Sequence, residues 1–439
     1  MKKANKTTVS PKGGNKPKSK FSFQAPKGMH DILPREQNIW NKVMKEAVET
    51  AEFYGFQRID IPTLEEADLF VRSAGADSDM VEKEMFYVRS GGKDRYVLRP
   101  EGTASIARAY LEHGLSHIGQ PAKLYYTGSM FRHEQPQAGR LREFHQFGFE
   151  TIGGSADPVY DAQIILVSFR LLEQCKLKGL SVQINSIGCR VCRPHYRKRL
   201  LDYYRRHEKE LCSDCVRRMK TNPLRLLDCK EQKCQALREK APSLMDNLCV
   251  SCSGHLKLVI EYLDELALPY TLNPYLVRGL DYYNKTVFEI FAEGYNMALV
   301  AGGRYDYLFD MIGARPTPAV GSAVGLERVI EVARQREVSF PERERPKVFL
   351  MYIGDMAKKK ALTLVEQFRV AGVRVREALG KDVLKKQMQL ADKENSDFAL
   401  ILGQKEVFEG SIIIRDLKSG NQESIPLDRV LQEVKKRLK

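Results

Sequence analysis

The sequence predicts an α+β core, an antiparallel sheet flanked by helices, that is interrupted by a cysteine-rich helical insertion and followed by a C-terminal α/β domain. Three observations lead to this prediction. Strands and helices come in blocks along the first part of the chain, without regular βαβ alternation. Eight of the nine cysteines lie between Cys189 and Cys252. After a polar, proline-bounded linker at residues 336–346, strands alternate with helices.

The elements of the core follow from local patterns. Apolar residues at helical spacing predict a helix over residues 34–54, and strands are expected in FQRIDIP, EMFYVRS and RYVLRP. A helix follows at 104–113. The segments KLYYTGSMFRH and REFHQFGFETIG alternate apolar and polar residues around the turn EQPQAG, which predicts an antiparallel hairpin. A helix at 157–174 and a strand in LSVQINSIG lead into the insertion.

The second half of the chain gives a similar pattern. A helix is expected at 255–266, a turn at 268–275, and a hairpin in KTVFEIFAE and NMALVAGG, after which AVGSAVGLERVIEVAR joins a small-residue strand to a helix. The final segment alternates strands such as KVFLMYIG and FALILG with helices, which predicts a compact domain with a mixed sheet. The predicted divisions are a disordered basic tail (1–20), the core in two parts (21–188 and 255–335), the insertion (189–254), the linker (336–346) and the C-terminal domain (347–439).

Charge is distributed unevenly along the 439 residues, whose formal net charge is +15. Residues 1–20 hold seven lysines and no acidic residue, and residues 189–254 hold sixteen Lys or Arg against eight Asp or Glu. Basic segments around a mildly acidic core indicate a polyanionic partner, although a solvated tail and ordinary charged helices are the alternative. Neither a membrane span nor a secretory signal is recognisable, so we expect no membrane association and a cytoplasmic location.

The cysteine pattern predicts metal binding rather than disulfides, because the chain has no export signal. The spacings are CRVC, CSDC, CKEQKC and CVSC, and two intervening residues let both sulfurs of a pair reach one ion. Eight thiolates suffice for two structural zinc sites. The sequence leaves the pairing open, and grouping in chain order, Cys189 and Cys192 with Cys212 and Cys215, is the simplest guess. The candidate ligands are Cys189, Cys192, Cys212, Cys215, Cys229, Cys234, Cys249 and Cys252.

The hairpin SMFRHEQPQAGRLREFHQFGFE, residues 129–150, concentrates arginine, glutamate and aromatic side chains. Guanidinium groups bind phosphate oxygens in forked geometry, a carboxylate accepts from a base amino group, and an aromatic ring stacks on the base. A surface hairpin with cross-strand ion pairs is the alternative. The segments LRPEGTA, LVRGLDYYNKTVFE, AGGRYDYL and GSAVGLERV carry further carboxylate, arginine, tyrosine and glycine residues.

In this order, the segments resemble those of the histidyl-tRNA synthetases, a class II aminoacyl-tRNA synthetase family. The hairpin resembles class II motif 2, AVGSAVGLERVI resembles motif 3, and residues 40–62 resemble the dimer-forming motif 1. LVRGLDYY and AGGRYD resemble two histidine-specific signatures, and residues 347–439 resemble the anticodon-binding domain. The resemblance, over residues 21–439, implies a homodimeric ligase that activates L-histidine with ATP and Mg²⁺ and transfers it to the 3′-terminal ribose of tRNA(His).

The resemblance also implies a role for individual residues. Three arginines act in catalysis: Arg132 and Arg328 at the α- and γ-phosphate regions of ATP, and Arg278 between the substrate carboxylate and the α-phosphate. The remaining ATP-binding residues are Glu134, Arg140 and Phe144. The histidine pocket comprises Glu101, Gly102, Thr103, Arg132, Gln146, Glu150, Arg278, Tyr282 and Tyr283. The tRNA acceptor end is expected to approach Gln135 and Gln137.

Carboxylates at Glu101 and Glu150 would accept N–H groups of imidazole, and an amino acid without them leaves buried acceptors unpaired, which gives roughly 10⁴-fold discrimination. Two features depart from the family. Its loops commonly read HERPQxGRYR, whereas Gln135 and Leu141 here replace Arg and Tyr, although Gln can still donate to a guanine edge. The insertion has eight cysteines, and we interpret it as a zinc-stabilised clamp on the acceptor stem.

Two other classes of protein remain as alternatives. The first is a non-catalytic paralogue of the kind that regulates ATP phosphoribosyltransferase, which lacks the anticodon domain and typically loses the ATP arginines. The second is a zinc-containing RNA-binding protein, which would not need a histidine pocket. Histidine-dependent exchange of pyrophosphate into ATP distinguishes both from the ligase.

Overall fold

The computed structural model describes residues 23–75, 78–89, 91, 95–137, 139–338, 345–378, 380–381 and 383–438. The chain divides into two compact units, Met1–Ser339 and Phe340–Lys439, which are considered separately below. The predicted basic tail at 1–20 and most of the predicted linker lie outside the described residues. Within the described ranges, no helix is both long and apolar enough to cross a membrane.

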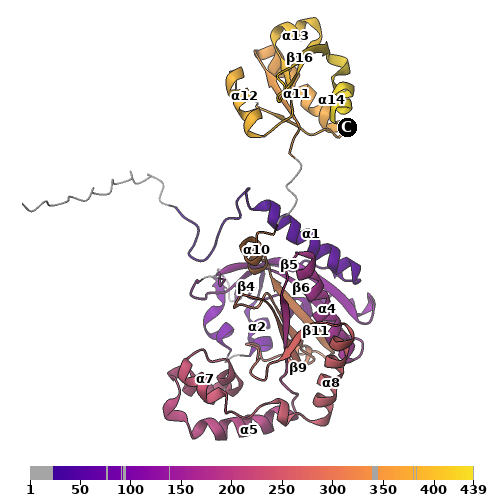
Figure 1. Ribbon diagram of the computed structural model, residues 1–439. Coiled ribbons are helices and arrows are strands. Elements are labelled where there is room, and N and C mark those ends of the chain that lie inside the picture. The colour runs from indigo at the N-terminus through magenta and orange to yellow at the C-terminus, as the bar shows by residue number, and fades with distance from the viewer. Residues whose placement is uncertain are drawn as a thin grey trace, which may run out of the picture. The chain divides into compact units, whose positions relative to one another are not determined.

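An eight-stranded sheet forms the centre of the first unit (Figure 1). Its order is β1-β5-β6-β11-β10-β9-β7-β8. The edge strands β1 and β8 pair in parallel with β5 and β7, and the other neighbours are antiparallel, which confirms the predicted core. The strands are β1 (Gln57–Arg58), β5 (Ala122–Phe131), β6 (Glu143–Ile152), β7 (Leu180–Ser186), β8 (Tyr270–Leu272), β9 (Asn284–Ala292), β10 (Val300–Arg304) and β11 (Ala319–Gly325).

Helix α4 (Pro158–Gln174) packs on this sheet and on two other helices, α1 (Gln37–Phe53) and α8 (Val250–Glu265). It begins where the Asp157 carboxylate accepts the N–H of Val159 at 2.9 Å, an N-cap that the proline in the first turn reinforces. A smaller sheet, in the order β2-β4-β3, supports the opposite side of the hairpin β5–β6. The remaining elements are β2 (Leu64–Glu66), β3 (Phe86–Val88), β4 (Tyr96–Leu98), α2 (Ala67–Ala74), α3 (Thr103–Glu112), α9 (Leu308–Met311) and α10 (Leu326–Gln335).

The insertion between β7 and α8 is helical, as predicted. Figure 1 shows two of its helices, α5 and α7, at the end of the first unit away from α1. Its apolar core is continuous with that of the rest of the first unit, because Tyr196, Tyr204 and Leu226 belong to the same buried cluster as Tyr282 and Tyr283. The helices and 3-10 turns are α5 (Cys192–Arg205), η3 (Glu208–Glu210), α6 (Ser213–Thr221), η4 (Pro223–Asp228), α7 (Gln232–Arg238) and η5 (Met245–Asn247).

The second unit contains a five-stranded mixed sheet in the order β13-β12-β14-β15-β16. The strand β12 is parallel to β13 and β14, and β15 is antiparallel to β14 and β16. The predicted α/β domain is therefore confirmed. Its elements are β12 (Val348–Tyr352), α11 (Asp355–Val370), β13 (Val375–Glu377), α12 (Leu384–Lys393), β14 (Phe398–Leu402), α13 (Gln404–Glu409), β15 (Ser411–Asp416), β16 (Gln422–Pro426), η6 (Leu427–Arg429) and α14 (Val430–Leu438).

Candidate active site

A cavity of about 1010 Å³ lies in the first unit, beside the hairpin β5–β6 and strands β9 to β11. Gly102 and Glu150 are buried behind the cavity wall, and Gln135 is exposed on the turn. The structure thus brings together side chains that are far apart in the sequence. The predicted residues that line the cavity are Glu101, Thr103, Arg132, Glu134, Gln137, Arg140, Phe144, Gln146, Arg278, Tyr282, Tyr283 and Arg328.

Glu150 lies at the bottom of the site on β6. Side chains alternate along a strand, so Gln146 and Glu150 share one face while Phe147 and Phe149 enter the core on the other. Opposite Glu150 is Gly321 of β11, where a Cβ atom would lie 1.6 Å from a carboxylate oxygen. A side chain at Gly321 would therefore displace the carboxylate, which explains why this strand contains small residues.

Two hydroxyl groups hold the Glu150 carboxylate. Thr103 donates to Oε1 at 2.7 Å, and Tyr305 donates to Oε2 at 2.5 Å. Burial raises the pKa of Glu150 from 4.5 to about 8, even though these hydrogen bonds favour the charged form, and the nearby Glu101 contributes to the increase. The site thus presents a carboxyl group that no cation neutralises among its described contacts.

Glu101 is fixed by the start of α3. Its two oxygens accept the backbone N–H groups of Thr103 and Ala104, at 2.7 and 2.9 Å, so this carboxylate caps the helix. The Tyr282 hydroxyl donates to it at 3.5 Å. Burial raises the pKa of Glu101, against the effect of the two N–H donors. Both predicted pocket carboxylates are therefore buried and held in one orientation before any ligand binds.

Two tyrosines of this pocket were not predicted as site residues. Tyr305 donates to Glu150, as described above, and Tyr126 lies between two glycines, Gly102 and Gly148, at which a Cβ atom would come within 2.3 Å of its ring. Tyr305 belongs to the quoted AGGRYD segment, so the signature itself contained the signal. Tyr126 lies on β5 in the pair YY, and the alternation of apolar residues along that strand gives no indication which tyrosine faces the site.

Arg140 of the cavity pairs with Glu134 at 3.3 Å, whereas Arg132 and Arg328 form no ion pair with a described carboxylate. Arg132 donates to the carbonyl of Pro100 at 2.9 Å, and its guanidinium lies 5.5 Å from the centre of the Phe144 ring. Arg328 donates to the carbonyls of Gly139 and Ala298, at 3.1 and 2.8 Å. Burial, together with nearby Arg140 and Arg132, lowers the pKa of Arg328. Neighbouring guanidinium groups that lower one another's pKa, as at Arg328, favour the binding of an anion.

Arg278 occupies a different part of the cavity. Its guanidinium pairs with Glu289 at 2.5 Å and lies 5.8 Å from the centre of the Tyr283 ring. Burial disfavours the charge, but Glu289 outweighs this effect and the pKa of Arg278 is raised. Among the described residues, the Nε of Arg278 and the Oε1 of Gln146 are buried without a hydrogen-bond partner. Both residues line the cavity, so a polar ligand there could satisfy them.

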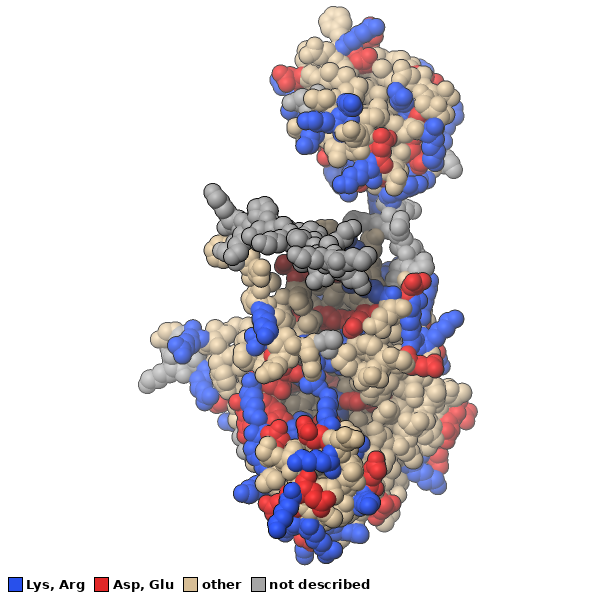
Figure 2. All heavy atoms as spheres, turned by 60° about the vertical axis from the view of Figure 1, so that its left-hand side comes forward, with Lys and Arg blue, Asp and Glu red and all other residues tan. Residues whose placement is uncertain are grey.

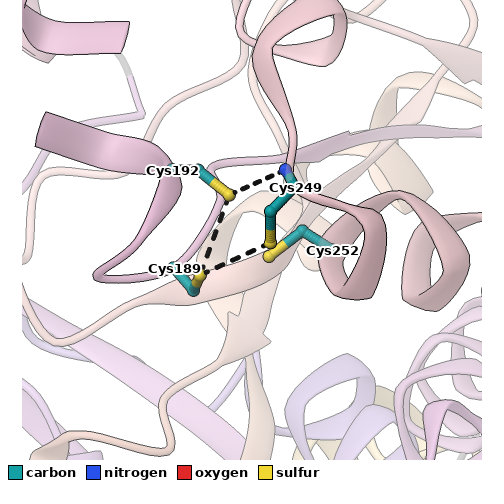
Figure 3. A group of neighbouring side chains, drawn as sticks. All are labelled: Cys189, Cys192, Cys249 and Cys252. Carbon is teal, nitrogen blue, oxygen red and sulfur yellow. Dashed lines mark hydrogen bonds between the residues drawn. The ribbon is translucent and has the colours of Figure 1, made fainter. Parts of the chain in front are cut away.

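The eight cysteines form two groups, each with its sulfur atoms within 4.8 Å of one another. In the outer cluster, defined here as Cys189, Cys192, Cys249 and Cys252, the first pair lies at the start of α5 and the second at the start of α8 (Figure 3). The inner cluster is Cys212, Cys215, Cys229 and Cys234. Grouping in chain order was therefore wrong, because the insertion folds back and brings its first and last pairs together.

The sulfur spacing in both clusters suits a tetrahedral ion. The Sγ atoms of Cys189 and Cys192 are 3.7 Å apart, those of Cys189 and Cys249 3.9 Å, and those of Cys212 and Cys229 3.8 Å. Four thiolates around one zinc ion, at a Zn–S distance of about 2.3 Å, would be separated by about 3.8 Å. The helix α8 begins at Val250, five residues before the predicted start, because it continues through the last cysteine pair.

Comparison with known proteins identifies the family. The sequence profile of the family described as histidyl-tRNA synthetase matches residues 28–329, and that of the anticodon binding domain matches residues 347–437. The chain belongs to the histidyl-tRNA synthetase family. A relative from Dehalococcoides mccartyi, named histidine–tRNA ligase, is 44% identical over 95% of this chain and 100% of its own length. A relative of the same name from Acetivibrio thermocellus is 40% identical over 94% of this chain and 99% of its own length.

Solved structures of histidyl-tRNA synthetases have the same fold. The apo enzyme of S. aureus superposes with a TM-score of 0.77 at 31% identity, over 94% of this chain and 99% of its own. A Bacillus halodurans protein described as an ATP phosphoribosyltransferase regulatory subunit/histidyl-tRNA synthetase gives a TM-score of 0.62 at 22% identity, over 87% of this chain and 99% of its own. At that identity only the fold is shared, so this match does not favour the regulatory alternative.

Proposed function

We propose that the chain is a histidine–tRNA ligase in which the two buried carboxylates select histidine and the three cavity arginines activate it. The ligase activity is that of the full-length relatives described above. One observation carries the residue assignment. The same cavity contains Arg132 and Arg328 and the side chains of Gln146 and Arg278, each of which has a buried polar atom without a hydrogen-bond partner. A regulatory paralogue would not need this set of groups.

In the first step the carboxylate of histidine attacks the α-phosphorus of ATP, and pyrophosphate leaves. Negative charge moves across the phosphate oxygens, and no protein nucleophile is required, so positioning and cationic stabilisation supply the catalysis. Arg278 would contact both the attacking carboxylate and the α-phosphate, while Arg132 and Arg328 would hold the triphosphate. Glu134, Arg140 and Phe144 would surround the adenine and the neighbouring phosphates. The 3′-terminal ribose hydroxyl of tRNA(His) then attacks the adenylate.

ATP use implies magnesium, which binds phosphate oxygens and prefers oxygen ligands. The cavity offers carboxylates in Glu289 and Glu327. Magnesium would neutralise charge on the β- and γ-phosphates. Throughout the step, the chain's own arginines would orient the α-phosphate toward the histidine carboxylate.

Glu101 and Glu150 would provide the selectivity for histidine. The imidazole and the ammonium group of the substrate are the only parts of histidine that donate hydrogen bonds, and the oxygens of both carboxyl groups are held in fixed orientations as acceptors. An amino acid without these donors would leave a buried acceptor unpaired, which costs about 1–3 kcal/mol or more for each such group. Gly102, Thr103, Tyr282 and Tyr283 would complete the pocket.

We further propose that each cysteine cluster holds one structural zinc ion, since four thiolates with this spacing suit zinc. The insertion would then be a rigid module beside the cavity. Figure 2 shows Lys and Arg side chains over the insertion, at the lower end of the view, interspersed with acidic ones. This surface and the exposed Gln135 and Gln137 of the hairpin turn would contact the acceptor end of the tRNA. Residues 40–62, which resemble motif 1, would form a homodimer.

Histidine-dependent exchange of labelled pyrophosphate into ATP tests the enzyme, and charging of tRNA(His) tests the complete reaction. The ligase should catalyse exchange only when histidine is present. A folded protein that shows no exchange would overturn the proposal. Zinc analysis of protein purified without chelator should give two ions per chain, and sedimentation should give a dimer.

A further inference from the structure

The insertion contacts the histidine loop, defined here as residues 276–283, at two separate points. This loop carries Arg278, Tyr282 and Tyr283 and contains no helix or strand. Its position therefore depends on contacts with its neighbours rather than on a regular backbone ladder. Both points of contact come from segments of the insertion that adjoin cysteine ligands.

The first contact comes from Arg193, which follows Cys192 in the first turn of α5. Its Nε donates to the carbonyl of Ile187 at 3.0 Å, and its terminal nitrogen donates to the carbonyl of Tyr283. Burial lowers the pKa of Arg193, while Asp281 and the thiolates of the outer cluster favour its charge. One half-buried guanidinium thus connects the outer cluster to the C-terminal end of the histidine loop.

The second contact comes from the segment between Cys215 and Cys229 of the inner cluster. Asn222 donates to the Asp281 carboxylate at 3.0 Å, and Arg225 donates to the Asp79 carboxylate at 3.0 Å. The guanidinium of Arg225 also covers Gly279, where a Cβ atom would lie 2.5 Å from its terminal nitrogen. The insertion therefore holds the middle of the loop as well as its end.

We propose that the two cysteine clusters clamp the histidine loop, so that their metal occupancy sets the affinity for histidine and not that for ATP. The inference deepens the proposed function and depends on it. A metal ion shared by Cys215 and Cys229 closes the segment that carries Asn222, and the ion of the outer cluster fixes the turn before Arg193. A segment whose two ends are held by one ion has fewer conformations available, so it loses less conformational entropy when it packs against the histidine loop. The ATP arginines Arg132 and Arg328, by contrast, donate to the carbonyls of Pro100, Gly139 and Ala298, and among the described residues none of these acceptors belongs to the insertion.

Two substitutions in the zinc-loaded, full-length enzyme test the clamp. Arg193→Met removes the first contact, and Arg199→Met is its matched control, because Arg199 lies on the same helix and donates to Asn247 within the insertion. Asn222→Ala removes the hydrogen bond to Asp281 from the second contact and leaves Arg225 in place. Gln235→Ala is its control, since Gln235 donates within the insertion to the carbonyl of Lys230. Zinc content, the Kd for histidine and the Kd for ATP are measured for each variant by metal analysis and calorimetry.

The expected result is a rise in the Kd for histidine of about tenfold for Arg193→Met and about threefold for Asn222→Ala, because a charged donor contributes more than a neutral amide. The Kd for ATP and both controls should stay at the wild-type value. Wild-type enzyme freed of zinc should also lose histidine affinity and regain it when zinc alone is restored. Should Arg193→Met lose its zinc, Asn222→Ala, which lies farther along the chain from a ligand, decides the outcome.

Unchanged histidine affinity in zinc-loaded Asn222→Ala and Arg193→Met would overturn the clamp, as would an equal loss of ATP affinity. Either outcome is distinguishable from failure of the proposed function, in which the wild-type enzyme itself shows no histidine-dependent exchange.

Discussion

Replacing Glu150 by glutamine should stabilise the protein at alkaline pH while it abolishes activity. The carboxyl group has its ordinary pKa of 4.5 in the unfolded chain and a pKa of about 8 in the folded chain. The folded state therefore binds the proton more tightly. The stability that this group contributes is fully present below pH 4.5 and is lost as the pH rises to about 8. Glutamine does not titrate, so the variant should escape this loss.

The magnitude follows from the shift of the pKa. A difference of about 3.5 units corresponds to roughly 5 kcal/mol at about 1.4 kcal/mol per unit, and this figure is an upper limit, because the glutamine amide loses part of the hydrogen bonding. The amide oxygen can still accept from Tyr305 or Thr103, the two hydroxyl donors. We therefore expect a gain of a few kcal/mol at pH 8.5 and none at pH 5.

The assay compares the midpoint of thermal unfolding of Glu150→Gln and wild type at pH 5 and pH 8.5. Glu112→Gln is the matched control, since Glu112 is exposed and pairs with Arg108, which lowers its pKa. The difference between variant and wild type should become more favourable at the higher pH only for Glu150. Pyrophosphate exchange should fall by about 100-fold or more at both pH values. An equal difference at both pH values would refute the reasoning.

Three further substitutions test other parts of the molecule. Asp161→Asn leaves the buried Arg304 with less countercharge and should cost about 3 kcal/mol of folding free energy, measured by denaturant unfolding; an unchanged midpoint would contradict this. Arg278→Lys keeps the positive charge but loses the forked donor geometry of the guanidinium group, and it should lower kcat for exchange by about 100-fold with an unchanged circular dichroism spectrum. A variant with the wild-type kcat would show that Arg278 has no part in the mechanism. Cys215→Ser should lose about one zinc ion per chain, whereas Cys175→Ser should retain both, because Cys175 lies outside the clusters; equal zinc contents would exclude the inner site.

Sequence patterns located most of the fold because they report local periodicity. Helix α4 was predicted at 157–174 and spans Pro158–Gln174, and the hairpin β5–β6 follows from alternating residues around a proline-glycine turn. Short or solvent-facing elements were missed. The strand β8 has three residues at a sheet edge, β16 is largely exposed and polar, and α13 has only six residues. Their pairing and packing partners, rather than their own composition, determine their conformation.

The candidate site shows the same limit. Motif residues such as Arg132 and Glu101 could be singled out because chemistry restricts the residue type. Tyr126 and Glu289 could not, because their roles arise from where the fold places them: one ring between two glycines, and one carboxylate beside Arg278. The raised pKa of Glu150 likewise depends on burial and on the nearby Glu101, and it persists although hydroxyl groups from α3 and from the residue that follows β10 favour the charged form.

The nested arrangement of the cysteines explains how the insertion can act on the site. Grouping in chain order would close two neighbouring segments, residues 189–215 and 229–252, and would not join the two ends of the insertion. In the observed arrangement the outer cluster joins the two ends of the insertion, where it leaves β7 and enters α8, and the inner cluster closes a segment within it. Two residues reach the histidine loop. Arg193 lies beside the outer cluster, and Asn222 lies in the segment that the inner cluster closes. Both restraints therefore act on the loop that binds the amino acid.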